Sequence, residues 1–151
     1  MIAYFLDTSA IVKRFATEIG YQWVIDLHNP MQQKDLFISQ VALVEVVAAL
    51  CQKERQGAID REERDALITL FRTTCQKTYN MIRVSNTIYQ LAGDLCTKHK
   101  LRAYDAIQLA CSLTIRNSNT GLDLTFVCAD NGLLAVASHE GLKIENPNLH
   151  P

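Results

Sequence analysis

The chain has 151 residues, of which 48% are hydrophobic and 21% are charged, and its formal net charge is −1. This length suits a single domain over residues 1–151 with a full hydrophobic core, and the composition argues against a disordered chain. The net charge argues weakly against a simple electrostatic nucleic-acid binder, but it leaves nucleic acid open as a partner. No apolar run approaches the roughly 20 residues that cross a bilayer, and Asp7 interrupts the N-terminal run before a signal-peptide core forms, so we expect a cytoplasmic protein.

Short apolar segments typical of buried strands alternate along the chain with longer segments whose apolar residues follow the helical period. This alternation favours a parallel sheet with helices on both faces. In chain order, the pattern predicts a strand over 2–6, helices over 9–16 and 19–29, a strand over 36–39, helices over 41–56 and 60–78, a strand over 81–84, helices over 85–100 and 103–117, a strand over 124–128, a helix over 132–138 and a strand over 142–145.

Two helix starts carry capping signals. Asp60 is followed three residues later by Glu63, a pattern that resembles a capping box. Ser85 precedes an apolar helical pattern and is a preferred N-cap residue. Both signals place helix boundaries independently of the hydrophobic pattern.

Four acidic residues stand where a carboxylate is a poor neighbour. Asp7 and Asp130 directly follow predicted buried strands, whereas Glu45 and Asp105 lie among apolar residues at the start of predicted helices. Removing a carboxylate from water is costly unless a cation or hydrogen bonds compensate it. Four such residues therefore suggest one shared cation site.

The predicted topology brings these acids to one edge of the sheet. Ligands of open parallel sheets bind beyond the carboxyl ends of the strands, which is where Asp7 and Asp130 stand. Helix starts at the same edge bring Glu45 and Asp105 toward them. Asp123 precedes the strand that Asp130 follows, so it lies roughly 23 Å away at the opposite edge, and we exclude it.

An all-oxygen ligand set indicates Mg²⁺ or Mn²⁺ as the cofactor, because these hard cations prefer carboxylate ligands. We expect no cysteine or histidine beside the four acids in the folded site. The five cysteines are odd in number, form no CxxC pair and are interpreted as buried thiols. The four histidines are scattered and show no zinc-binding spacing.

Each acid also has a purely structural interpretation. Asp7 could cap the next helix or form a turn, and Asp130 could form an Asx turn. Asp105 could stabilise a helix dipole, and Glu45 could pair with a basic residue. All four interpretations would have to hold at once for the site to be absent.

The segments around the acids resemble the PIN-domain ribonucleases, and most closely the VapC-like toxins of type II toxin-antitoxin pairs. The order and spacing of these segments agree with those of the family over nearly the whole chain. The matching segments read YFLDTSAIVK around Asp7, SQVALVEV around Glu45, LRAYDAIQLA around Asp105 and FVCADN around Asp130.

The resemblance implies a PIN-like three-layer α/β/α sandwich with a central parallel sheet, a metal-dependent endoribonuclease that cleaves RNA, a cognate antitoxin partner and a homodimer. It assigns catalysis and metal binding to Asp7, Glu45, Asp105 and Asp130, with Ser9 as the hydroxyl that orients the site. Some relatives have a second acid shortly after the fourth one. Asn131 and Gly132 stand here instead, which disfavours a fully occupied two-metal site and leaves Asn131 as a neighbour of the acids.

Basic residues near the expected edge are candidates for contacts to the RNA backbone, although solvated helix ends are the simpler interpretation. They are Lys13, Arg14, Lys98, Lys100 and Arg102.

Three other functions are weighed against the nuclease. A haloacid-dehalogenase-type phosphatase needs a second Asp two residues after the first, where this chain has Ser9. A response-regulator receiver needs an early acidic pair and a lysine after a late strand, and neither is visible. A catalytically inert PIN-like module that binds RNA or protein is the remaining alternative, although a pure binding surface gains nothing from packed carboxylates.

Overall fold

Five parallel strands form one sheet in the order β3-β2-β1-β4-β5 in the computed structural model, which describes residues 1–151. Two central strands, β1 and β4, pair along their whole length. This sheet confirms the predicted parallel α/β architecture. The strand bounds are Ile2–Leu6 for β1, Asp35–Ser39 for β2, Asn80–Ile82 for β3, Asp123–Val127 for β4 and Lys143–Glu145 for β5.

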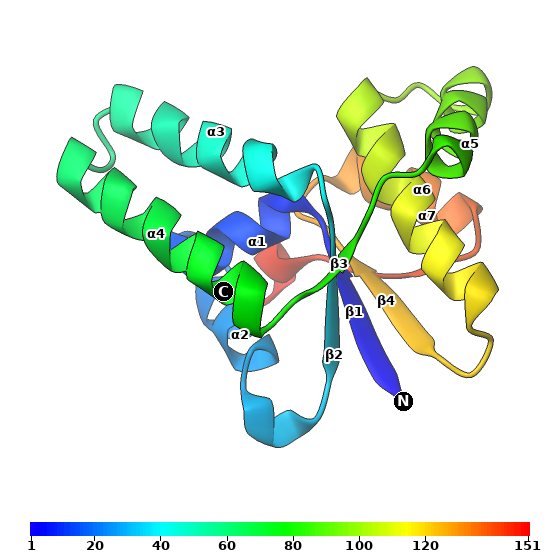
Figure 1. Ribbon diagram of the computed structural model, residues 1–151, viewed down its shortest axis with the longest axis horizontal. Helices are drawn as coiled ribbons and strands as arrows, with labels where there is room; N and C mark the ends of the chain where they lie inside the picture. Colours follow the sequence, from blue (N-terminus) through cyan, green and yellow to red (C-terminus); the bar gives the residue numbers. More distant parts are fainter.

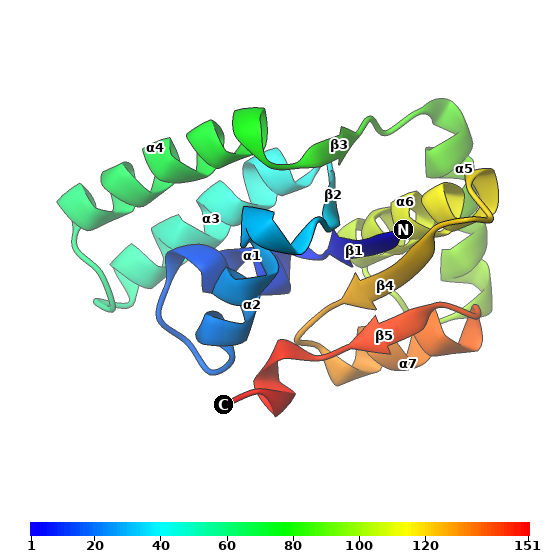
Figure 2. The same ribbon diagram turned by 90° about the horizontal axis from the view of Figure 1, so that it is seen from below.

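Helices cover both faces of the sheet, so the fold has three layers (Figures 1 and 2). Helices α1 to α4 lie on one face and α5 to α7 on the other, which confirms the predicted sandwich. None of the helices combines the length and apolar character that crossing a membrane requires. The helix bounds are Thr8–Phe15 for α1, Tyr21–Leu27 for α2, Ala42–Arg55 for α3, Arg61–Lys77 for α4, Asn86–Lys98 for α5, Ala103–Ser118 for α6 and Asn131–His139 for α7.

The two faces of the sheet carry separate hydrophobic clusters. On the face covered by α5 to α7, the rings of Phe5 and Phe126 stack with centroids 5.8 Å apart. On the other face, Phe15 of α1 meets Phe71 of α4 edge to face at 5.5 Å. Strands buried on both faces explain why the strand segments read as continuous apolar runs.

All predicted strands and helices occur, with boundaries that differ by no more than two residues. The capping box at Asp60 and Glu63 is confirmed by both of its hydrogen bonds, and Ser85 caps α5 by accepting from the amide of Ile88. Two short 3-10 helices, Pro30–Gln32 and Pro147–Leu149, were not predicted, because each spans only three residues and carries no periodic signal.

The strand order creates a crevice between β1 and β4. From β1 the chain proceeds outward to β2 and β3, and it then returns across the sheet to β4 and β5 on the other side of β1. Connections therefore leave β1 and β4 in opposite directions, and ligand sites of open α/β sheets form at such points. The amide of Asp7 donates to the carbonyl oxygen of Val127 at 3.0 Å, so the two strand ends adjoin directly.

Candidate active site

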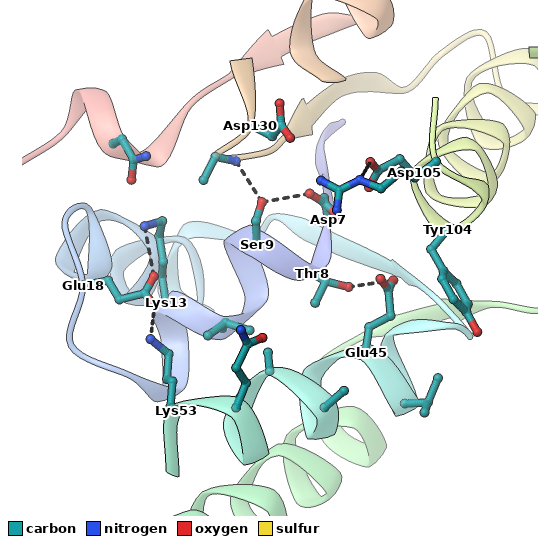
Figure 3. Close-up of a pocket in the computed structure, with 18 of the residues that line it drawn as sticks. Asp7, Thr8, Ser9, Lys13, Glu18, Glu45, Lys53, Tyr104, Asp105 and Asp130 are labelled. Atoms are coloured by element: carbon teal, nitrogen blue, oxygen red, sulfur yellow. Dashed lines mark hydrogen bonds and ion pairs between the residues drawn. The ribbon is translucent and has the colours of Figure 1, made fainter. Parts of the chain in front are cut away.

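One pocket of about 940 Å³ opens at the carboxyl ends of the strands, and all four predicted acids line it. Asp7 directly follows β1, and Asp130 caps α7 just beyond β4. Glu45 and Asp105 lie in the first turns of α3 and α6. Figure 3 shows the four side chains converging on the pocket from these separate elements. The predicted convergence is therefore present in the fold.

Asp7 is the most buried of the four acids, with 6% of its surface exposed. Its Oδ2 accepts hydrogen bonds from Ser9 Oγ at 2.8 Å and from Cys128 Sγ at 3.0 Å. Burial raises the pKa of Asp7 above its usual value, and these two hydrogen bonds partly oppose that shift. Asp7 occupies the N-cap position of α1, as the structural interpretation has it, but its side chain makes no capping hydrogen bond to that helix.

Ser9 connects the ends of β1 and β4. Its Oγ donates to Asp7 and accepts from the amide of Ala129 at 2.9 Å (Figure 3). Ser9 therefore contacts the acid that the resemblance implies it orients, and the orienting role stays a prediction. The expectation that no cysteine adjoins the acids is wrong, because β4 pairs with β1 and thereby places Cys128 against Asp7.

Glu45 is held by two neutral donors from other helices. Its Oε1 accepts from Thr8 Oγ1 at 3.0 Å and from Gln108 Nε2 at 2.9 Å. Burial is the main cause that raises the pKa of Glu45, and the negative charges of Asp7 and Asp105 add to it. No basic side chain pairs with Glu45, so the salt-bridge interpretation is wrong.

Asp105 lies half-buried at the start of α6, with Oδ2 3.7 Å from Nε of Arg102. Burial raises the pKa of Asp105, the charge of Asp7 raises it further, and Arg102 opposes the shift. The charge of Asp130 also raises this pKa. Asp7 and Asp130 therefore both act on Asp105 as neighbouring like charges.

Asp130 combines a structural role with exposure to the pocket. Its Oδ1 accepts from the amides of Gly132 and Leu133 at 2.8 and 3.1 Å, which confirms the predicted Asx-type turn. Its Oδ2 accepts no hydrogen bond. Asn131, expected beside the acids, instead accepts from Nδ2 of Asn146 at 2.8 Å and does not line the pocket.

A family model for the PIN domain matches residues 4–120. The chain belongs to the PIN domain family. The matched range contains Asp7, Glu45 and Asp105, and the family membership predicted from the sequence segments is confirmed. No curated protein sequence matches the chain significantly.

Solved structures with the same fold cover nearly the whole of this PIN domain. VapBC2 from Rickettsia felis, bound to a DNA fragment from its promoter, matches at a TM-score of 0.65 and 16% identity over 97% of this chain and 98% of the other. A toxin-antitoxin complex from Klebsiella pneumoniae matches at a TM-score of 0.64 and 19% identity, over 95% of this chain and 97% of the other. VapC20 from Mycobacterium tuberculosis, described as a sarcin-ricin loop cleaving toxin, matches at a TM-score of 0.62 and 14% identity. The match covers 98% of this chain and 99% of the other. At these identities the likeness shows the fold.

The basic residues proposed from the sequence occupy different places in the PIN domain. Lys13 and Arg102 line the pocket of the acids. Lys13 is buried there and donates to Glu18 and to the carbonyl oxygen of Ile19, whereas Arg102 is exposed at the edge. Lys98 lines a second pocket instead, and Arg14 and Lys100 line neither.

Asp123 lies at the opposite edge of the sheet, as predicted. Asp123 is the first residue of β4, whereas Asp130 lies beyond the last residue of that strand. The side chain of Asp123 forms an ion pair with Lys143 of β5. Two residues that donate hydrogen bonds to Glu45 were missed: Thr8, which lines the pocket, and Gln108, which is buried in α6. Their signal was their position in the motif segments, directly after Asp7 and three residues after Asp105.

Proposed function

We propose that this PIN domain is a metal-dependent endoribonuclease. One observation carries the proposal: four carboxylates from four separate elements line a single pocket at the crevice between β1 and β4. Three of them, Asp7, Glu45 and Asp105, have raised pKa values because burial disfavours their charges, and neighbouring carboxylates raise the pKa values of Glu45 and Asp105 further. A fold bears this cost where a cation offsets it, and we assign that role to Mg²⁺ or Mn²⁺.

The donor atoms fit such an ion. Oε2 of Glu45 and Oδ2 of Asp130 accept no hydrogen bond, so each remains available as a ligand, and Asp105 has only the distant Arg102 as a charged partner. No three of the acids bring ligand atoms within 4.8 Å of one another. This spacing suits Mg²⁺, which keeps several waters and needs only one or two direct carboxylate ligands.

The chain's own residues set up the reaction around that ion. When bound, a divalent cation lowers the pKa of a water and neutralises charge on the scissile phosphate. Ser9 and Cys128 fix the Asp7 carboxylate, while Thr8 and Gln108 fix Glu45. These bonds hold the acids in place before substrate binds, so little reorganisation is required during cleavage.

Two exposed residues at the pocket suit a nucleic-acid strand. Arg102, 87% exposed in its side chain, can pair with a backbone phosphate. Tyr104 is exposed at the same pocket and offers a ring on which a base can stack (Figure 3). The choice of RNA as substrate is supported by the fold shared with VapC20.

We further propose that residues 1–151 act as one PIN-like toxin with a cognate antitoxin, and as a homodimer in the cytoplasm. The fold shared with VapBC2 and with the Klebsiella toxin-antitoxin complex supports the antitoxin partner. Size-exclusion chromatography with light scattering tests the dimer, and a monomeric mass at micromolar concentration would contradict it.

The deciding experiment compares Asp7→Asn with Asp123→Asn in cleavage of single-stranded RNA. Asp7→Asn should abolish Mg²⁺- or Mn²⁺-dependent cleavage, and a chelator should abolish cleavage by the wild type. Asp123→Asn changes an acid of the same type at the far edge of the sheet and should remain active. Full activity in Asp7→Asn would refute the proposal.

The alternative is a catalytically inert PIN-like module that binds RNA or protein. Titration of thermal stability with Mg²⁺ or Mn²⁺ separates the two, since a ligand stabilises only the state that it binds. A rise in Tm that Asp105→Asn abolishes supports the nuclease. No shift at millimolar metal favours the inert module.

A further inference from the structure

The carboxyl ends of α5 and α7 meet on the face of the sheet that α5 to α7 cover, outside the pocket of the acids. His99 caps α5, His139 is the last residue of α7, and Glu140 caps α7. The two imidazole rings lie edge to face with centroids 5.1 Å apart. Both helices lie on the same side of the sheet in Figure 1. Histidines that look scattered in the sequence are therefore neighbours in the fold.

These three side chains form a compact donor set. Each offers one ligand atom, and the three atoms lie within 4.8 Å of one another, which holds for no other trio of His, Cys, Asp or Glu in the chain. Nε2 of His99 is already 2.9 Å from Oε1 of Glu140. The side chains of His99 and Glu140 are only 14% and 16% exposed, so packing limits their freedom before any ligand binds.

The surroundings favour a cation at this point. Two helix carboxyl ends each present partial negative charge toward the cluster. In this structure Lys98 supplies the positive charge beside the Glu140 carboxylate, with Nζ 2.9 Å from Oε1. Its side chain is 56% exposed and can turn into solvent. Arg116 donates to the backbone oxygen of Glu140 at 2.7 Å and fixes the turn that carries the carboxylate.

Beside the cluster there is room for further ligands. A second pocket of about 510 Å³ is lined by both histidines together with Lys98, Ala135 and Val136. Two imidazoles and one carboxylate are the ligand set of many Zn²⁺ sites that keep one position open for water. Mg²⁺ prefers oxygen ligands, so the chemistry of this cluster differs from that of the acidic pocket.

We propose that His99, His139 and Glu140 bind a transition-metal cation of the Zn²⁺ class, with the fourth position open to water. Binding replaces Lys98 at the Glu140 carboxylate and links α5 to α7, two helices that are far apart in the sequence. The site is independent of the proposed nuclease activity, because it shares no residue with the acidic pocket.

Isothermal titration calorimetry with Zn²⁺ in excess Mg²⁺ tests this site in the intact protein. The wild type and Asp105→Asn should each bind one Zn²⁺ at the cluster with equal affinity. His139→Gln should bind it at least about tenfold more weakly, since loss of even a partner outside the ligand shell costs about 10–100-fold. Lys98→Gln should bind as tightly as the wild type or more tightly, because it removes the competing cation.

Circular dichroism without metal checks that each variant is folded, and His99→Gln provides a second ligand variant at a less exposed position. Wild-type Zn²⁺ affinity in both His99→Gln and His139→Gln would overturn the proposal. Absence of any Zn²⁺ binding below millimolar concentration in the wild type would overturn it as well, and would leave the cluster as an ion pair between Lys98 and Glu140.

Discussion

Nε2 of Gln108 lies 2.9 Å from Oε1 of Glu45 and also 3.0 Å from Oγ1 of Thr8. Gln108 is fully buried in α6, and its own Oε1 has no hydrogen-bond partner. A buried amide that leaves one polar atom unsatisfied is costly unless the remaining contacts serve a purpose. We infer that this purpose is to orient the Glu45 carboxylate toward the pocket.

Gln108→Leu should therefore reduce RNA cleavage by about tenfold, the lower end of the range for residues that orient metal ligands. The Gln108 hydrogen bond lowers the pKa of Glu45, so its loss raises that pKa and shifts the acid limb of the pH-rate profile to higher pH. Ser112→Ala, which changes a buried polar residue on the same helix, is the control. An unshifted profile in Gln108→Leu would contradict an orienting role.

Cys128→Ala should raise the Mg²⁺ concentration needed for half-maximal activity. The Cys128 hydrogen bond lowers the pKa of Asp7, so its loss favours the protonated acid, which binds metal poorly. The expected change is about three- to tenfold, because a thiol is a weak donor and a neutral hydrogen bond contributes about 0.5–1.5 kcal/mol. Cys128→Ser retains a donor and should behave more like the wild type, and Cys111→Ala controls for loss of a buried thiol. If Cys128→Ala and Cys128→Ser needed the same Mg²⁺ concentration for half-maximal activity, this explanation would be wrong.

Asp105→Asn should stabilise the protein without metal at pH 7. The pKa of Asp105 is raised in the folded state, so the folded protein holds this proton more tightly than the unfolded chain does. Stability is therefore lost as pH rises from about 4, the value for the unfolded chain, through the folded pKa. The variant should gain a few degrees in Tm at pH 7, since 1 kcal/mol corresponds to about 2–4 °C in a domain of this size.

The pH dependence provides the check on this stabilisation. At pH 3, where Asp105 is protonated in both states, the difference in Tm between Asp105→Asn and the wild type should shrink toward zero. Saturating Mg²⁺ at pH 7 should reverse the order by stabilising only the wild type. A Tm difference that is constant across pH would show that the gain has another cause.

Phe71→Ala should lower the free energy of unfolding by about 3–5 kcal/mol, the usual cost of truncating a buried phenylalanine. Phe71 is the one buried residue of α4 and packs edge to face on Phe15. Leu70→Ala, at the neighbouring and largely exposed position, should cost only about 0.5 kcal/mol. Urea denaturation measures both, and similar losses in the two variants would mean that α4 is not anchored through Phe71.

Much of the fold could be predicted because its signals are local. Strand and helix boundaries follow apolar runs, the helical period and capping residues such as Asp60 and Ser85. The short 3-10 helices escaped prediction since three residues carry no periodicity. The prediction of buried thiols is confirmed only for Cys111 and Cys128. Cys51 and Cys75 are half-buried and Cys96 is exposed, because a cysteine outside the core follows the same apolar pattern as a buried one.

The acidic pocket could be predicted for a different reason. Asp7, Glu45 and Asp105 stand out because a carboxylate in an apolar segment is an energetic misfit that can be read without a structure. The residues that donate hydrogen bonds to these acids are not unfavourably placed in the sequence, so they do not stand out in the same way. Thr8, Gln108 and Cys128 are ordinary residues in ordinary positions, and only the packing of other elements brings them to the acids.

The sequence by itself determined the α/β class, the order of the elements and the acids that share one edge of the sheet, because each follows from local pattern and from the geometry of parallel strands. The tertiary structure decided the contacts between elements distant in sequence. It placed Cys128 on Asp7 through the pairing of β4 with β1, and it brought His99 to His139 through the meeting of two helix ends. Such contacts depend on strand order and helix packing, which no single segment encodes.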